Sequence, residues 1–77
     1  MAERVMWQQR SSLSADKEHS LLYRSTAYGR GVQMEVHTPI KADGEPGESC
    51  MYWFIDGDSR EFRSEEAMLE ALRGLQE

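Results

Sequence analysis

Cysteine is nearly absent from this chain, which contains a single one, Cys50. One cysteine excludes an internal disulfide framework, so packing and hydrogen bonds must hold the fold. Long apolar runs are also missing, and nothing approaches the roughly 18 residues of a membrane span. No apolar stretch of about seven residues follows the N-terminus, so we expect no signal peptide. These absences favour the cytoplasm, a reducing compartment in which a free thiol persists.

Basic residues are scarce relative to acidic ones, with nine Lys and Arg against fourteen Asp and Glu and a net charge of −5. The imbalance lies in residues 31–77, which hold four basic and eleven acidic residues, whereas residues 1–30 hold five and three. An acidic chain repels phosphate groups, which argues against general nucleic-acid binding. Seventy-seven residues form one small domain whose core depends on its few aromatic side chains.

Two stretches in the first half of the chain predict strands. Ser20–Tyr28 is rich in strand-forming residues, although neither set of alternate positions is cleanly apolar. Val32–Thr38 alternates strictly between apolar and polar residues, which predicts one buried and one wet face. Between them, Gly29-Arg30-Gly31 predicts a turn, because glycine takes positive φ without strain. The charged, glycine-containing segment 41–48 predicts an exposed loop.

The apolar run Cys50–Ile55 predicts a third strand, which is apolar on both faces and therefore central or in contact with a partner. Asp56-Gly57 is a hairpin signal, and Ser59–Arg63 predicts a fourth strand with Phe62 as its main apolar residue. A three-residue loop would place Phe62 with the even-numbered residues of the third strand, and a two-residue turn with the odd-numbered ones. The register stays open, because a shift of one residue reverses the faces.

The end of the chain predicts one amphipathic helix, from about Glu65 to Arg73. Ser64 is a typical N-cap, and Gly74 is placed to take the left-handed position after the helix. A helix of about nine residues is not stable alone, so its apolar stripe must dock on the sheet. The stripe consists of Met68, Leu69, Ala71, Leu72 and Leu75.

Residues 1–19 form the least regular part of the chain. Their first part is compatible with a short strand or a helical turn, Ser11–Ser14 with a loop, and Ala15–Glu18 with a short helix. We therefore expect an N-terminal arm over residues 1–19, which is ordered if Trp7 packs on the domain. Residues 20–77 are expected to form the single folded domain.

Together these elements predict an α+β fold: a three- or four-stranded, mainly antiparallel meander with the C-terminal helix packed across one face. The helix stripe and the apolar side of the sheet would form its core. The predicted core residues are Leu22, Val32, Met34, Val36, Tyr52, Phe54, Phe62, Met68, Leu72 and Leu75, with Trp53 and Trp7 added to them.

No motif in the chain predicts an enzyme, a metal site or a cofactor site. The possible metal ligands His19, His37, Cys50 and Glu35 match no zinc spacing, and structural zinc normally needs four ligands. Glu35 and His37 are neighbours on one strand face, which suits acid–base chemistry, but such pairs are common on solvated strands. We therefore expect no catalytic, cofactor-binding or metal-binding residues.

Protein interaction is the function that the third strand favours. Its apolar side chains outnumber what one face of one helix can cover, so either the segment around Trp7 or another chain covers the rest. We predict a non-enzymatic accessory or regulatory module that binds another protein or a second copy of itself. Its interaction surface would consist of Met51, Trp53, Ile55 and Trp7. A clean monomer in light scattering, together with a fully buried Trp53, would remove the main support for this prediction.

The alternative function is single-stranded nucleic-acid binding through Tyr52, Trp53 and Phe54. Aromatic side chains on a sheet can stack bases, and arginines of the chain can contact phosphates. Five acidic residues lie within Asp56–Glu66, however, and they would repel the strand.

Overall fold

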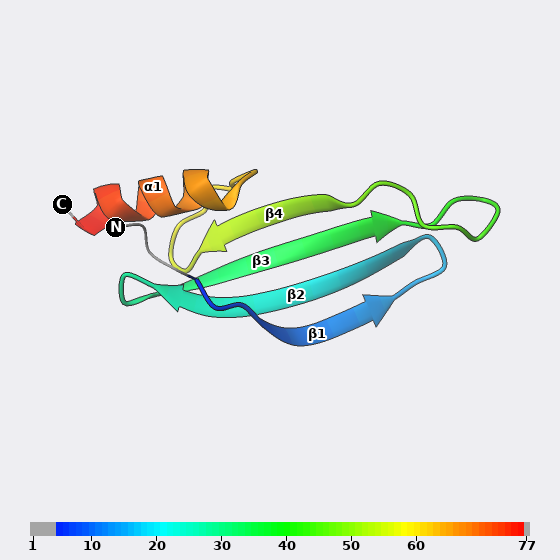
Figure 1. The fold of residues 1–77 in the computed structure, drawn as a ribbon, viewed down its shortest axis with the longest axis horizontal. Helices are drawn as coiled ribbons and strands as arrows, with labels where there is room; N and C mark the ends of the chain where they lie inside the picture. Colours follow the sequence, from blue (N-terminus) through cyan, green and yellow to red (C-terminus); the bar gives the residue numbers. More distant parts are fainter. Residues whose placement is uncertain (1–4, 77) are drawn as a thin grey trace.

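A computed structural model describes residues 5–76 as a four-stranded antiparallel sheet with one helix (Figure 1). The elements are β1 (Gln8–Ser14), β2 (Glu18–Ala27), β3 (Arg30–Pro39), β4 (Cys50–Ile55) and α1 (Glu65–Gln76). Each strand pairs with the next one along the chain, in the order β1-β2-β3-β4. The predicted α+β class is therefore confirmed. None of the described helices is long and apolar enough to span a membrane.

The sheet begins earlier in the chain than the sequence suggests. Ser11–Ser14, expected to be a loop, belongs to β1, which pairs with β2 from Gln8 to Ser14 and has a bulge at Arg10. Every side chain of β1 is exposed, so backbone pairing rather than apolar burial holds this edge strand. The segment Ala15–Glu18 was expected to be a short helix. It forms a tight turn instead, in which the Ala15 N–H donates to the Glu18 carbonyl at 2.9 Å. The sheet thus continues across residue 19, and residues 1–4 of the predicted arm lie outside the described residues.

The hairpin between β2 and β3 turns at Tyr28 and Gly29, whose φ angles are 49° and 76°. Two consecutive positive φ angles match the twist of the flanking strands in a two-residue hairpin. The sequence predicted the turn at Gly29-Arg30-Gly31, which is too far along the chain, because Arg30 and Gly31 already pair with β2 in the sheet. A bulky residue in this conformation is strained, and the ring of Tyr28 packs against the core, which offsets the strain.

The predicted fourth strand, Ser59–Arg63, is reduced to one bridge between Trp53 and Phe62. Their backbones exchange two hydrogen bonds of 2.9 Å each. Asp56-Gly57 forms the predicted turn, with Gly57 at φ 84°. Phe62 therefore pairs with an odd-numbered residue of β4, which resolves the register that the sequence leaves open.

Helix α1 begins where the sequence predicts and ends later. The Ala67 N–H donates to Ser64 Oγ at 3.1 Å, which is the expected N-cap. Gly74 was expected to end the helix, but α1 continues through it to Gln76. Met68 and Leu72 are fully buried against the sheet. The fully or largely buried residues are Ala27, Val32, Met34, Trp53, Ile55, Met68 and Leu72.

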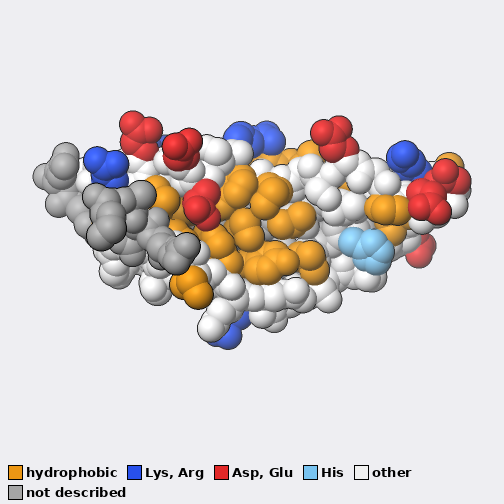
Figure 2. All heavy atoms as spheres, in the orientation of Figure 1, with side chains coloured by type: hydrophobic (Ala, Val, Ile, Leu, Met, Phe, Trp, Pro, Cys, Tyr) orange, Lys and Arg blue, Asp and Glu red, His pale blue; other side chains and the backbone are white. Residues whose placement is uncertain are grey.

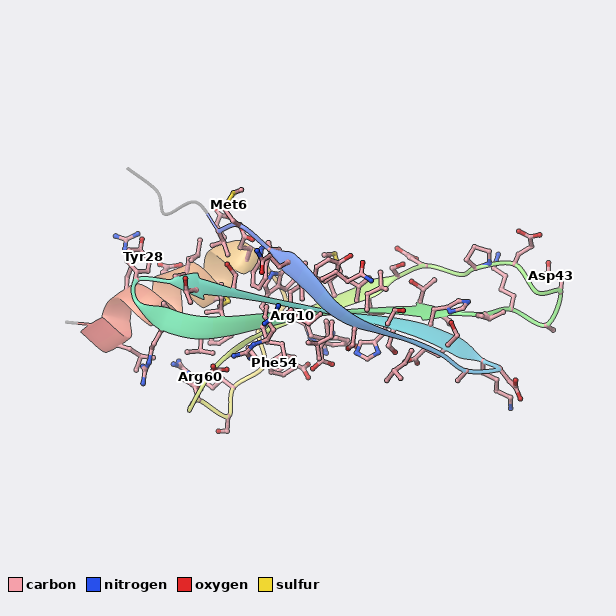
Figure 3. The ribbon with its side chains drawn as sticks, turned by 90° about the horizontal axis from the view of Figure 1, so that it is seen from below. Met6, Arg10, Tyr28, Asp43, Phe54 and Arg60 are labelled. Carbon is pink, nitrogen blue, oxygen red and sulfur yellow. The ribbon has the colours of Figure 1, made fainter. Side chains whose placement is uncertain are left out.

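The register of β4 places a different set of residues in the core than predicted. Met34 lies opposite both Tyr23 and Trp53, so these three share the face that α1 covers. The predicted core residues Tyr52, Phe54 and Leu22 consequently point to the other side of the sheet. Figure 3 shows Phe54 on the opposite side of the sheet from Met6. Two further members of the predicted core differ in burial: Val36 is only half-buried and Leu75 is 47% exposed.

Candidate interaction surface

One half of the sheet face that carries α1 is left uncovered. The helix has 12 residues and is therefore about 18 Å long, whereas the longest dimension of the protein is 49 Å. Figure 1 shows α1 next to β4, at one end of the sheet only. The N-terminal segment lies at the same end, where Val5 and Trp7 pack against the core. The strands beyond this end have no second layer among the described residues.

Apolar side chains occupy this uncovered half next to the core. Val36 lies opposite Leu21 on β2 and Met51 on β4, so the three form one row across the sheet. Leu21 and Val36 are half-buried and Met51 is 40% exposed. Tyr23, in the adjoining row, packs against the core cluster. We call Leu21, Tyr23, Val36 and Met51 the apolar patch, and Figure 2 shows apolar side chains gathered at the middle of this face.

The paired strand positions beside and beyond the apolar patch are uncharged. In the described structure, no Asp, Glu, Lys or Arg occupies a regularly paired strand position on this face from the Leu21 row outward. Those positions hold Ser12, Ser14, His19, Leu21, Val36, Thr38 and Met51. The Ser14 hydroxyl lies 2.7 Å from Nδ1 of His19, so even the polar rim has an internal partner.

The residues predicted for the interaction surface are divided between core and surface. Trp53 and Ile55 are 8% and 2% exposed, because α1 packs on them, so they offer no free surface. Trp7 is half-buried and its Nε1–H donates to Glu65 Oε1 at 2.6 Å, which ties the N-terminal segment to the start of α1. Of these four predicted residues, only Met51 is exposed. Sequence reasoning missed Leu21 and assigned Val36 to the core, because it could not tell how far the helix reaches.

The opposite face of the sheet, which we call the open face, carries a polar network. His37 Nδ1 lies 2.8 Å from Glu18 Oε1, and His37 Nε2 lies 2.9 Å from Glu35 Oε1. The two carboxylates, Glu35 foremost, raise the pKa of His37 above its ordinary value. In turn, the hydrogen bond from His37 lowers the pKa of Glu18. This network joins β2 to β3 through side chains.

A second ion pair extends the polar network toward the β4 turn. Arg24 donates to both carboxylate oxygens of Asp56, at 2.9 and 2.6 Å, and also to Gln33 at 3.2 Å. The hydrogen bonds from Arg24 lower the pKa of Asp56. Both side chains are partly exposed, so the pair is screened by solvent and fixes geometry more than it adds stability.

The three aromatic residues of the nucleic-acid alternative lie on different faces. Tyr52 and Phe54 are on the open face and half-buried, whereas Trp53 is in the core. The guanidinium of Arg63 lies 4.5 Å from the ring centroid of Tyr52. The His37 ring meets Tyr52 edge-on, with centroids 5.5 Å apart. A stacking surface for bases would therefore consist of two aromatics rather than three.

The possible catalytic and metal-binding residues are only partly brought together. Cys50 is exposed and lies directly opposite His37, but both nitrogens of His37 already face carboxylates, which leaves none to accept the thiol proton. His19 lies on the other face of the sheet. Within residues 5–76, no three His, Cys, Asp or Glu side chains are arranged to hold a metal ion.

Comparisons of this chain with protein families, with curated proteins and with solved structures find no significant match. Function must therefore be argued from the two sheet faces. One combines an apolar patch with an uncharged rim, and the other a polar network with two aromatic rings.

Proposed function

We propose that this protein is a non-enzymatic accessory module of the cytoplasm that works by binding another polypeptide chain through the apolar patch. The observation that supports the proposal is the uncovered row of Leu21, Val36 and Met51 beside the core. Contiguous apolar surface with a polar rim is typical of protein interaction sites. Because the patch continues the core, a partner would act as the missing second layer of the sheet.

The composition of the patch suits recognition better than catalysis. Methionine and tyrosine are enriched at protein interfaces, and charged residues are depleted at their centres. Each square ångström of apolar surface that a partner covers contributes roughly 25 cal/mol, before the cost of association. The regularly paired strand positions of the uncovered rows hold no Asp, Glu, Lys or Arg. A partner would therefore cover these positions without burying a charged side chain there.

Capture experiments with matched variants test this function. The full chain, immobilised, is offered native lysate and a differently tagged copy of itself, and Met51→Glu is compared with Leu13→Glu. Leu13 is the matched control, since it is 70% exposed and lies on the open face, opposite Ser20 of β2. We expect a bound polypeptide to be retained by the wild type and by Leu13→Glu and to be lost with Met51→Glu. Identical capture by all three chains would overturn the proposed function.

A second candidate function, binding of single-stranded nucleic acid, is favoured by one observation. Tyr52 and Phe54 both lie on the open face, and Arg63 is stacked on Tyr52. Each base stacked on an aromatic ring contributes about 1–3 kcal/mol. Glu18 and Glu35 on the same face oppose it. Fluorescence anisotropy of a labelled oligothymidylate at low salt tests this second function. The oligonucleotide should bind the wild type, and its affinity should fall when salt is added and when Tyr52 is replaced in Tyr52→Leu.

A further inference from the structure

We infer that the chain which covers the apolar patch is a second copy of this protein, so that the uncovered halves of two sheets stack face to face about a two-fold axis. The inference rests on the proposed function and names its partner. Three properties of the molecule carry it: the distribution of charge, the shape of the single chain and the position of the helix.

Charge favours this face over the open face as a contact between two copies. The chain has a net charge of −5, so two copies repel each other over most of their surfaces. Stacking the open faces would bring Glu18, Glu35 and Asp56 of both copies together. Among these, within residues 5–76, Asp56 alone is paired with an arginine, Arg24. The uncovered half of the helix face has no such groups at its paired strand positions. Two identical patches can therefore approach without burying like charges.

The shape of the chain indicates a missing layer. Its radius of gyration is 14.1 Å, whereas a compact domain of 77 residues is expected to have about 11.5 Å. The excess arises because the sheet is long and thin, with overall dimensions of 49 × 24 × 19 Å. A second layer over the uncovered half would bring the assembly closer to the compactness of ordinary domains.

The uncovered area allows a weak dimer. Beyond the row of Tyr23 and Met34, β2 and β3 each continue for five residues, about 17 Å, and the four strands span about 19 Å, which gives on the order of 300 Å² per copy. Two such faces stay below the roughly 1,000 Å² in total of stable specific interfaces. We therefore expect a weak dimer that forms at high concentration and dissociates reversibly.

The position of α1 sets the symmetry of the dimer. Two stacked sheets lie about 10 Å apart, which is close to the thickness of a helix. The two helices therefore need to lie at opposite ends of the assembly. This places the two-fold axis across the strands, midway along the uncovered half, between the row of Leu21, Val36 and Met51 and the outer row of His19 and Thr38. A two-fold contact is self-complementary, so each residue near the axis lies close to its own copy.

Sedimentation equilibrium of the full chain across a wide concentration range tests the inference. A reducing agent is present, so that disulfides through the exposed Cys50 do not contribute. We expect the mass to rise from 8.9 kDa toward twice that value. Met51→Glu and Met51→Lys should each shift the dissociation constant at least tenfold toward the monomer. Because Met51 lies close to its own copy, mixing these two variants should restore a dimer, while Leu13→Glu should behave as the wild type.

The outcomes separate this inference from the proposed function. A wild-type chain that stays monomeric at all concentrations, or a dimer that persists in both Met51 variants, overturns the second copy as partner. Failure of the mixed Glu and Lys variants to associate overturns it as well. If the wild type is monomeric while another polypeptide is still captured through Met51, the proposed function stands and the self-association falls. Circular dichroism of each variant confirms that it is folded.

Discussion

At the residue scale, Gly31 shows how a missing side chain positions a charged one. A Cβ built at this position would overlap the carboxylate of Asp56, which holds Arg24. The sequence places Gly31 in a turn for its conformational freedom, but the residue lies in β3 and its φ is not in the left-handed region. Its function is to leave space, so that the Asp56 turn can close against the open face.

Replacement of Gly31 should therefore depend on Asp56. We expect Gly31→Ala to destabilise the wild type by about 1 kcal/mol, because the carboxylate must move away from Arg24. In an Asp56→Ala background the same substitution should be neutral or slightly stabilising, since alanine reduces the entropy of the unfolded chain. Urea unfolding of the two single variants and the double variant measures the coupling. Simple additivity would show that Gly31 has another reason to be glycine.

Leu72 and Leu75 lie on the same helix but differ in burial, with exposures of 0% and 47%. Leu72→Ala should lower the free energy of unfolding by about 2–5 kcal/mol, most of the stability of so small a domain. Leu75→Ala should change it by about 0.5 kcal/mol, as is usual for surface positions. Thermal unfolding followed by circular dichroism compares the two. Equal losses would mean that the end of α1 packs more tightly than the structure shows.

At the element scale, β2 and β3 are joined by side chains as well as by their backbones. His37 on β3 is flanked by Glu18 from β2 and Glu35 from its own strand. The groups that face it from β4 are Cys50, directly opposite, and Tyr52. Neither carries a positive charge, so the two carboxylates dominate the surroundings of the imidazole. We call the contact of His37 with Glu18 and Glu35 the junction between β2 and β3. The junction is strongest when His37 is charged and Glu18 is ionised.

The stability of the junction should depend on pH with a definite sign. The folded pKa of His37 is raised above its ordinary 6.5, so its contribution is complete below that value and is lost as the pH rises through the folded pKa. The pKa of Glu18 is lowered below its ordinary 4.5, so its contribution is complete above that value and is lost as the pH falls through the folded pKa. The junction should be strongest between these two ordinary values.

Thermal unfolding between about pH 5.5 and 8.5 tests the His37 part of this prediction. In a His19→Gln background, where His37 is the one remaining histidine, the melting temperature should fall by a few degrees as the pH rises. A further His37→Gln substitution should remove that fall. A melting temperature that rises over this range would contradict the raised pKa of His37.

The elements differ in how far the sequence could predict them. Strand β3 was predicted well, because its strict alternation has only one interpretation. Strand β1 was missed, since its Gln and Ser side chains are all exposed and its pairing needs only backbone groups. The two apolar faces of β4 gave no signal for orientation. Pairing with β3 therefore decided which of Trp53 and Tyr52 faces the core.

At the scale of the whole molecule, the proposed dimer brings together two chains that each carry a charge of −5. Their repulsion weakens as salt screens it, because the Debye length falls from about 30 Å at 0.01 M to about 10 Å at 0.1 M. We therefore expect the dimer to become several-fold tighter when sodium chloride is raised from about 0.02 to 0.3 M. Sedimentation equilibrium measures this, with Leu13→Glu as a control that should respond at least as strongly. A dimer that weakens with salt would indicate that ion pairs, rather than the apolar patch, hold it.

The sequence by itself determined the local elements of this protein: the alternating strand β3, the turn at Asp56-Gly57 and the helix that starts after Ser64. These depend on residues close together in the chain, whose spacing and conformational preferences are visible in the sequence. Only the tertiary structure decided which side of β4 is buried and how much of the sheet α1 covers. Both depend on pairing and packing between segments far apart in the chain, and a period of two distinguishes the faces of a strand without showing which one is inside.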